Sequence, residues 1–271
     1  MRHCFVTVAL ALPLLLVAAD APEVPAFARE RPEVRSGEPI FAFNGKDLTG
    51  FYTYTKRHGY ADPEQIFTVH DGMVHVSGKD FGGLVTCGNF RDYHLVIEWK
   101  WGPNTWAPRE GKARDSGILL HCVGPDGAAG GQWMQSQECQ IIEGGCGDLI
   151  IVRGKARPSL TCEVRTGSDK QLYYEKGGQE VTRSDGRYNW WGRDPGWKDE
   201  LGFRGRNDVE KPAGEWNRME VICDGDRITN IVNDYVVNVG TGSSLTEGKI
   251  LFQSEGAEIF FRKVEVRPLM K

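Results

Sequence analysis

The sequence predicts an all-β protein, a β-sandwich or jelly roll with long irregular loops. From Pro39 onward, short runs of alternating apolar and polar residues recur at intervals of roughly 8–12 residues, the spacing of strands in such folds. Glycine-bearing turns separate these runs, and no segment longer than about ten residues has a helical period. The 271 residues could form one large β domain or two small ones, and the unbroken strand pattern favours one.

Two Asp-Gly dipeptides predict β-hairpins within this domain. Asp71-Gly72 divides the run IFTVHDGMVHVSG, and Asp224-Gly225 divides NRMEVICDGDRITNIVND. Between them, YHLVIEWKW at residues 93–101 alternates large apolar side chains with more polar ones, as expected of a strand with one face in the core. Residues 183–214 lack such alternation and predict a long irregular segment.

The first residues predict export. Arg2 and His3 precede an apolar stretch at 5–17, and Val17-Ala18-Ala19 suits a signal peptidase, so residues 1–19 are expected to be a signal peptide. The apolar stretch is shorter than the roughly 20 residues that cross a bilayer, so no membrane span is expected after cleavage. Residues 20–38 are rich in Pro, Ala, Glu and Arg and predict a flexible leader, which leaves 39–271 as the folded domain. The mature protein would be periplasmic or extracellular.

Charge and ligand spacing narrow the possible partners. The net charge is −4 and the basic residues form no block, so nucleic acid is not an expected partner. The sequence requires no cofactor, because it contains no CxxC pair with a later partner and no histidines at metal-ligand spacing. A divalent cation held jointly by Asp115, His121 and Glu138 is nevertheless possible.

The strand-like stretch SQECQIIEGG, residues 136–145, contains the strongest candidate for a site. Side chains alternate along a strand, so Glu138 and Gln140 project together, whereas Glu143 points the other way unless a β-bulge intervenes. Carboxyl groups are rarely buried without partners. The strand therefore either faces water or lines a binding site.

Further polar positions could share that site. Asp115 and His121 have the same parity on RDSGILLH, so both could face one cleft, although a structural histidine near a strand end is an equal alternative. Trp190 and Trp191 could stack on a sugar ring or simply pin their loop to the sandwich. The expected substrate-binding residues are Gln140, Asp115, Glu98, Arg218, Gln253, Glu255, Trp190 and Trp191.

Several fragments, in order along the chain, resemble one known family. They are FAFNGKDLTGF, FTVHDGMVHVSG, DYHLVIEWKW, RDSGILLH, ECQIIEGG, KPAGEWNRMEVICDGDRITNIVND and ILFQSEGAEIFFRKVEVRPL. Together they resemble the 3-keto-disaccharide hydrolase domain family over residues 39–269. The resemblance implies a concanavalin A-like jelly roll and a carbohydrate partner, namely a glycoside oxidised to a ketone at sugar carbon 3. It also implies C2 deprotonation followed by elimination, or formal hydrolysis if water then adds.

Three interpretations of the candidate catalytic residues remain open. For the ketone chemistry, Glu138 and His121 are the candidate acids or bases. A Glu-x-Asp-x-x-Glu strand with a bulge is similar to the catalytic strand of laminarinase-type glycosidases, and Gln140 occupies the middle place here. Glu138 and Glu143 would then be the catalytic pair of a retaining glycosidase. The third interpretation is a carbohydrate-binding module without catalysis.

Overall fold

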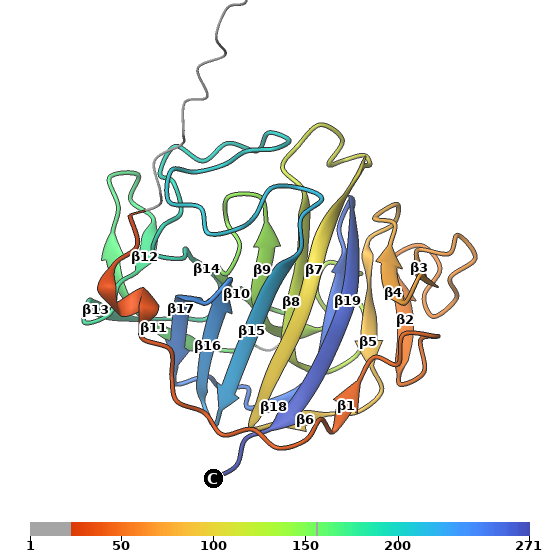
Figure 1. Ribbon diagram of the computed structural model, residues 1–271, viewed down its shortest axis with the longest axis horizontal. Helices are drawn as coiled ribbons and strands as arrows, with labels where there is room; N and C mark the ends of the chain where they lie inside the picture. The colour runs from red at the N-terminus through yellow and green to blue at the C-terminus, as the bar shows by residue number, and fades with distance from the viewer. Residues whose placement is uncertain (1–22, 156) are drawn as a thin grey trace, which may run out of the picture.

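The computed structural model describes residues 23–155 and 157–271, and in that part the chain forms two antiparallel sheets packed face to face (Figure 1). The all-β sandwich predicted from the sequence is confirmed. Helical structure in the described residues is limited to a 3₁₀ turn, η1 (Ala26–Arg29). None of the described residues belongs to a helix long and apolar enough to cross a membrane. The predicted signal peptide, residues 1–19, lies outside the described residues.

The larger sheet has eleven strands in the described chain. In spatial order they are β12 (Leu172–Tyr174), β11 (Leu160–Thr166), β17 (Tyr235–Thr241), β16 (Arg227–Val232), β15 (Asn217–Asp224), β7 (Tyr93–Thr105), β19 (Ala257–Pro268), β4 (Met73–Val76) and β3 (Phe67–His70), with β13 (Gln179–Arg183) paired to β11 and β1 (Phe41–Ala42) paired to β19. This sheet faces the viewer in Figure 1.

The smaller sheet has eight strands in the described chain, and one of them contains Glu138 and Gln140. Its order is β14 (Gly186–Tyr188), β10 (Leu149–Val152), β9 (Gln135–Ile142), β8 (Asp115–Val123), β18 (Glu247–Ser254), β5 (Gly82–Thr86) and β2 (Phe51–Thr55), with β6 (Phe90–Arg91) paired to β18. Strands β8 and β9 therefore lie near its middle.

The main hydrophobic core lies between the two sheets. Leu95, Ile97 and Trp99 of β7 are buried in it, so the alternation expected at residues 93–101 is present. From the smaller sheet, Cys139 and Ile141 of β9 enter the same core. Residues with the other parity on β9, including Glu138 and Gln140, consequently lie on the outer face of the smaller sheet.

Both predicted hairpins are present. His70 pairs with Met73, so Asp71-Gly72 is a two-residue loop, and both residues have positive φ, +51° and +74°. That conformation is the one for which Asp-Gly is favoured. In the second hairpin Asp224 pairs with Arg227, which leaves Gly225 in the loop with φ of +56°.

The described part of the predicted leader, residues 23–38, contacts the domain. Ala28 of η1 is fully buried, and the Phe27 ring packs edge-on against Tyr174 at 5.6 Å. Arg31 donates to Glu220 at 2.7 Å, and Ser36 forms a bridge with Leu269 beyond the end of β19. This segment is therefore attached to the larger sheet, with η1 beside β12 (Figure 1).

Candidate functional site

Three carboxyl groups meet on the outer face of the smaller sheet, and we refer to Asp115, Glu138 and Glu255 as the carboxyl cluster. Asp115 begins β8, Glu138 is central in β9, and Glu255 directly follows β18. The ladder between β8 and β9 pairs Gly117 with Gln140 and Leu119 with Glu138. Asp115 and Glu138 are buried, and Glu255 is half-buried.

A glycine makes room for the Glu138 carboxyl. A Cβ on Gly117 would lie 2.1 Å from Glu138 Oε1 and 2.5 Å from Gln253 Oε1. Glu138 and Gln253 therefore converge over the backbone of Gly117, from the strands on either side of β8. Any side chain at this position would displace one of them.

Asp115 is held from two directions. Gln140 Nε2 donates to Asp115 Oδ1 at 2.8 Å, and Arg109 Nη2 lies 3.4 Å from Asp115 Oδ2. Arg109 also donates to the Asp199 carboxylate at 2.8 Å. Asp115 is thus the member of the cluster with an arginine in direct ion-pair range.

A second arginine approaches from the far side of β9. On β10, Ile150 pairs with Glu138 on one side and with Arg187 of β14 on the other, so Arg187 shares the outer face with Glu138. Arg187 Nη1 contacts the fully buried Asp148 carboxylate at 3.1 Å. Arg187, together with Arg193 and Trp197, also lines a cavity of about 460 Å³.

Burial raises the pKa of each member of the carboxyl cluster. The pKa of Glu138 rises to about 8, first through loss of water and then through the nearby charge of Asp115. The pKa of Asp115 rises to about 7 through burial, opposed by Arg109 and Arg187. The pKa of Glu255 is raised well above its usual value by burial and by both other carboxyls. Near neutral pH the cluster therefore holds exchangeable protons.

Two amide side chains in the same place have unused hydrogen-bonding capacity. Gln253 Nε2 and Oε1, and Gln140 Oε1, are buried and have no partner among the described residues. Buried polar atoms are nearly always satisfied, by protein, water or a ligand. Amides beside carboxyls offer the donors and acceptors that bind sugar hydroxyls.

The metal-ligand set considered from the sequence is not brought together. Asp115 and Glu138 lie in the cluster, but His121 does not. Within residues 23–155 and 157–271, no group of three or more His, Cys, Asp or Glu side chains is arranged to hold a metal ion.

His121 is separated from the carboxyl cluster by a β-bulge. The ladder between β8 and β9 shifts register between Leu120 and Val123, and His121 has φ of +50°. Its ring is fully buried and packs edge-on against Tyr93 of the main core, with centroids 5.5 Å apart. The assumption of a regular strand, which placed His121 and Asp115 on one face, is wrong. Burial also lowers the pKa of His121 to about 4, so the ring stays neutral.

Glu143 is buried as well, but its carboxylate is fully engaged. Arg114 Nη1 donates to Glu143 Oε1 at 2.6 Å, and the backbone N–H groups of Arg114 and Gly202 donate to Oε2 at 2.9 and 2.8 Å. The ladder between β8 and β9 is regular from Glu138 to Ile142, so no bulge returns Glu143 to the Glu138 face. The Gly202 contact ties residues 189–216, the irregular segment between β14 and β15, to the sandwich. None of these contacts supports a Glu138 and Glu143 catalytic pair.

Glu98 and Arg218 lie on the opposite side of the molecule. They pair with each other across β7 and β15, on the outer face of the larger sheet. Glu98 Oε2 accepts a hydrogen bond from Arg262 Nε at 2.6 Å, and Arg218 lies 3.8 Å away from its other oxygen. Both expected substrate-binding residues are therefore parts of a surface ion-pair network remote from Glu138.

Trp190 and Trp191 belong to the main core. They are 1% and 6% exposed, and their rings pack edge to face with centroids 5.0 Å apart. Their indole N–H groups donate to the backbone oxygens of Gly144 and Val236. The expectation of a sugar-stacking wall at these positions is corrected, because the rings pin the irregular segment to the sandwich.

Sequence reasoning did not identify Arg109, Arg187 or Gly117 as parts of the site. Arg187 shares a face with Glu138 only through strand pairing across β10, and Arg109 contacts Asp115 from the loop after β7. Neither arrangement has a local signal in the sequence. For Gly117, a glycine within an otherwise regular strand pattern was a usable indication of close approach.

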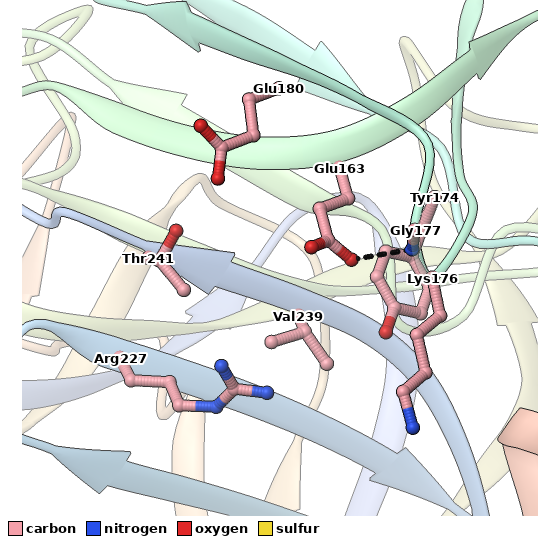
Figure 2. A pocket seen from close by; sticks show the side chains of 8 residues that line it. All are labelled: Glu163, Tyr174, Lys176, Gly177, Glu180, Arg227, Val239 and Thr241. Carbon is pink, nitrogen blue, oxygen red and sulfur yellow. Dashed lines mark hydrogen bonds between the residues drawn. The ribbon is translucent and has the colours of Figure 1, made fainter.

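A second cavity, of about 480 Å³, lies on the larger sheet. Figure 2 shows its lining, with Glu163 of β11 and Glu180 of β13 on one side, Arg227 of β16 on the other, and Val239 between them. Glu163 accepts a hydrogen bond from the Gly177 N–H at 2.8 Å, while Glu180 and Arg227 are exposed. The charged groups that line this second cavity are therefore solvated, unlike those of the carboxyl cluster.

The fold and the carboxyl cluster define a β-sandwich protein with an acid-lined site on one sheet. The model of the 3-keto-alpha-glucoside-1,2-lyase-like domain matches residues 38–267, so the chain belongs to that family. This confirms the resemblance found in the sequence. No curated protein matches the chain.

Distant solved structures are also similar to this chain. A candidate glycosyl hydrolase of Parabacteroides distasonis is 18% identical, with a TM-score of 0.47, covering 84% of this chain and 92% of the other. A non-specific endo-beta-1,3(4)-glucanase of family GH16 is 11% identical, with a TM-score of 0.48 and coverages of 88% and 97%. The carbohydrate-binding module CBM66 of Bacillus subtilis is 9% identical, with a TM-score of 0.42 and coverages of 72% and 85%.

Proposed function

We propose that this protein is an exported enzyme that cleaves the glycosidic bond of 3-keto-glycosides, with the carboxyl cluster as its active site. The observation that carries the proposal is the pair Asp115 and Glu138, buried together with raised pKa values, beside amide atoms of Gln140 and Gln253 that have no partner among the described residues. Family membership supports the substrate class.

The chemistry needs one base and one acid. A ketone at C3 acidifies the hydrogen on C2, so a carboxylate can remove that proton and leave an enolate. The enolate then returns to a ketone at C3 and a C1=C2 double bond forms, which gives an enone. The C1–O bond breaks in this step, and an acid protonates the departing oxygen. Addition of water to the enone would complete a formal hydrolysis.

We assign Asp115 as the base and Glu138 as the acid. Arg109 and the Gln140 amide stabilise the Asp115 anion, so Asp115 ionises more readily than Glu138. Glu138 has no direct cationic partner among residues 23–155 and 157–271, so it keeps its proton at neutral pH and can deliver it to the leaving oxygen. In this proposal Gln253 and Arg187 donate hydrogen bonds to the sugar and to the developing enolate.

A paired assay tests the proposal. Purified protein is incubated with a 3-keto-glucoside and with the matching unoxidised glucoside, and release of the aglycone is followed. Release from the ketone alone is the expected result. Release from both would indicate a conventional glycosidase, and binding without release would indicate a carbohydrate-binding module, so either outcome would refute the ketone chemistry.

Export is part of the proposal and rests on residues 1–19. When the full chain is expressed in a bacterium, the mature protein should appear outside the cytoplasm with a new N-terminus near Asp20. A full-length product that stays in the cytoplasm would contradict this.

A further inference from the structure

An aromatic pair lies next to the carboxyl cluster on the outer face of the smaller sheet. In the ladder between β18 and β5, Ser254 pairs with Gly82, so the continuing antiparallel register puts Glu255 opposite Phe81. The Lys56 N–H donates to the Phe81 carbonyl at 2.7 Å, which extends the sheet to this position. Phe81 has the parity of Val85, an outer-face residue, and therefore projects from the same face as Glu255.

Trp133 extends the surface that Phe81 begins. The two rings stack with centroids 6.1 Å apart and an interplanar angle of 19°. The Trp133 indole N–H donates to the Gly82 carbonyl at 3.3 Å, which fixes the ring over the end of β5. Both side chains remain partly exposed, in contrast to the buried Trp190 and Trp191.

The position of this pair complements that of the cavity lined by Arg187. Arg187 and Arg193, which line the cavity, influence the charges of the carboxyl cluster from the β14 side, and Phe81 and Trp133 lie on its β5 side. A glycosidic bond cleaved at the cluster would therefore have one ring on each side. Beyond the pair, Tyr54 and Tyr60 continue the aromatic surface, with centroids 5.3 Å apart and Tyr60 67% exposed.

We propose that Phe81 and Trp133 form a stacking subsite for the group attached through the glycosidic oxygen, and that this group contains a flat ring with an apolar face. Aromatic side chains bind sugar and aryl rings in this way because both present flat, weakly hydrated C–H or π surfaces. The proposal rests on the proposed function for its assignment to the leaving group. It makes the protein selective for ring-bearing aglycones over small alkyl ones.

Equilibrium binding of unoxidised ligands tests this subsite without requiring turnover. Phenyl α-glucoside, an α-linked glucose disaccharide and methyl α-glucoside are titrated by calorimetry into wild type, Phe81→Leu, Trp133→Leu and Phe81→Tyr. A matched control is Trp216→Leu, because Trp216 lies beside Lys100 and Arg262 on the other sheet. Thermal unfolding of each variant identifies any loss of fold.

We expect wild type to bind a ring-bearing ligand about tenfold more tightly than methyl glucoside. The preference should fall below about threefold in Phe81→Leu and Trp133→Leu and persist in Phe81→Tyr and Trp216→Leu. Whether the phenyl ligand or the disaccharide shows the larger preference identifies the natural ring as aryl or sugar. Equal binding of all three ligands by wild type, no binding of any, or an unchanged preference in the leucine variants would overturn the subsite.

The same variants separate this inference from the proposed function. If 3-keto-glycosides are not cleaved but the binding preference depends on Phe81 and Trp133, the ketone chemistry fails and the subsite stands. If 3-keto-glycosides are cleaved without any aglycone preference, the subsite fails and the ketone chemistry stands.

Discussion

The outer faces of the two sheets each present a glutamate in the middle of a long strand, yet in opposite surroundings. Glu98 of β7 is partly exposed and paired with Arg262, and Arg218 lies nearby. Glu138 of β9 is buried, has no direct cationic partner in the described part of the chain, and lies beside another carboxyl. An exposed, paired carboxylate needs no functional explanation, whereas a buried carboxyl without a cation costs stability. This contrast is the reason we propose that the outer face of the smaller sheet carries the active site.

The largest expected effect on stability comes from Glu143, which is buried like Glu138 but paired like Glu98. Glu143→Ala would leave the Arg114 guanidinium buried without its partner, at an expected cost of about 3–5 kcal/mol in the free energy of unfolding. Urea denaturation measures this. The double variant Arg114→Met with Glu143→Leu should recover much of the loss. A Glu143→Ala variant as stable as wild type would show that the Glu143 carboxylate does not hold the 189–216 segment to the sandwich.

Glu138→Gln should have the largest effect on turnover. We expect at least about a 100-fold loss of 3-keto-glycoside cleavage with the fold intact, the size typical of losing an acid or base. Initial rates together with the circular dichroism spectrum provide the measurement. Near wild-type turnover in this variant would remove Glu138 from the mechanism.

The raised pKa values predict a particular dependence of stability on pH. Glu138 and Asp115 bind protons more tightly in the folded protein than in the unfolded chain, so stability should fall as pH rises from about 4.5 to about 8. Glu138→Gln removes one of these groups and should reduce the decline by on the order of 1 kcal/mol or more. Unfolding curves at several pH values compare the two proteins, and identical slopes would contradict a buried, protonated Glu138.

Glu98→Gln should have the smallest effect. Its ion pairs are partly exposed, so the free energy of unfolding should change by less than about 1 kcal/mol and turnover should stay near that of wild type. The same denaturation and rate measurements apply. A loss of turnover comparable to that of Glu138→Gln would mean that the two faces were wrongly distinguished.

The sequence was sufficient for the fold and for part of the site, because both depend on strand parity. Alternation at residues 93–101 and two Asp-Gly turns predicted the strands and hairpins. Parity also grouped Glu138 with Gln140, and the structure brings both together with Asp115 and with two other expected substrate-binding residues, Gln253 and Glu255. Each of these inferences used only neighbouring residues on one strand.

Two kinds of feature could not be predicted from the sequence. One is a bulge that interrupts a regular strand, and the other is the proximity of side chains on strands that pair far apart in the sequence. A bulge at His121 reversed its expected direction, and nothing in RDSGILLH indicates a bulge. Arg187 shares the outer face with Glu138 across an intervening strand, and this arrangement depends on the register of β9, β10 and β14. For Trp190, composition alone does not distinguish a ring that packs into the core from one that lines a cleft.

The most direct test of the account follows the hydrogen on C2 of the substrate. A 3-keto-glucoside carrying deuterium at C2 is cleaved in ordinary water, with a control lacking enzyme to measure spontaneous exchange. The account predicts that cleavage by wild type releases the deuterium to solvent, and that Asp115→Asn loses both release and cleavage. A cleaved sugar that retains its deuterium at C2 would show that the bond breaks without deprotonation, and would contradict the account.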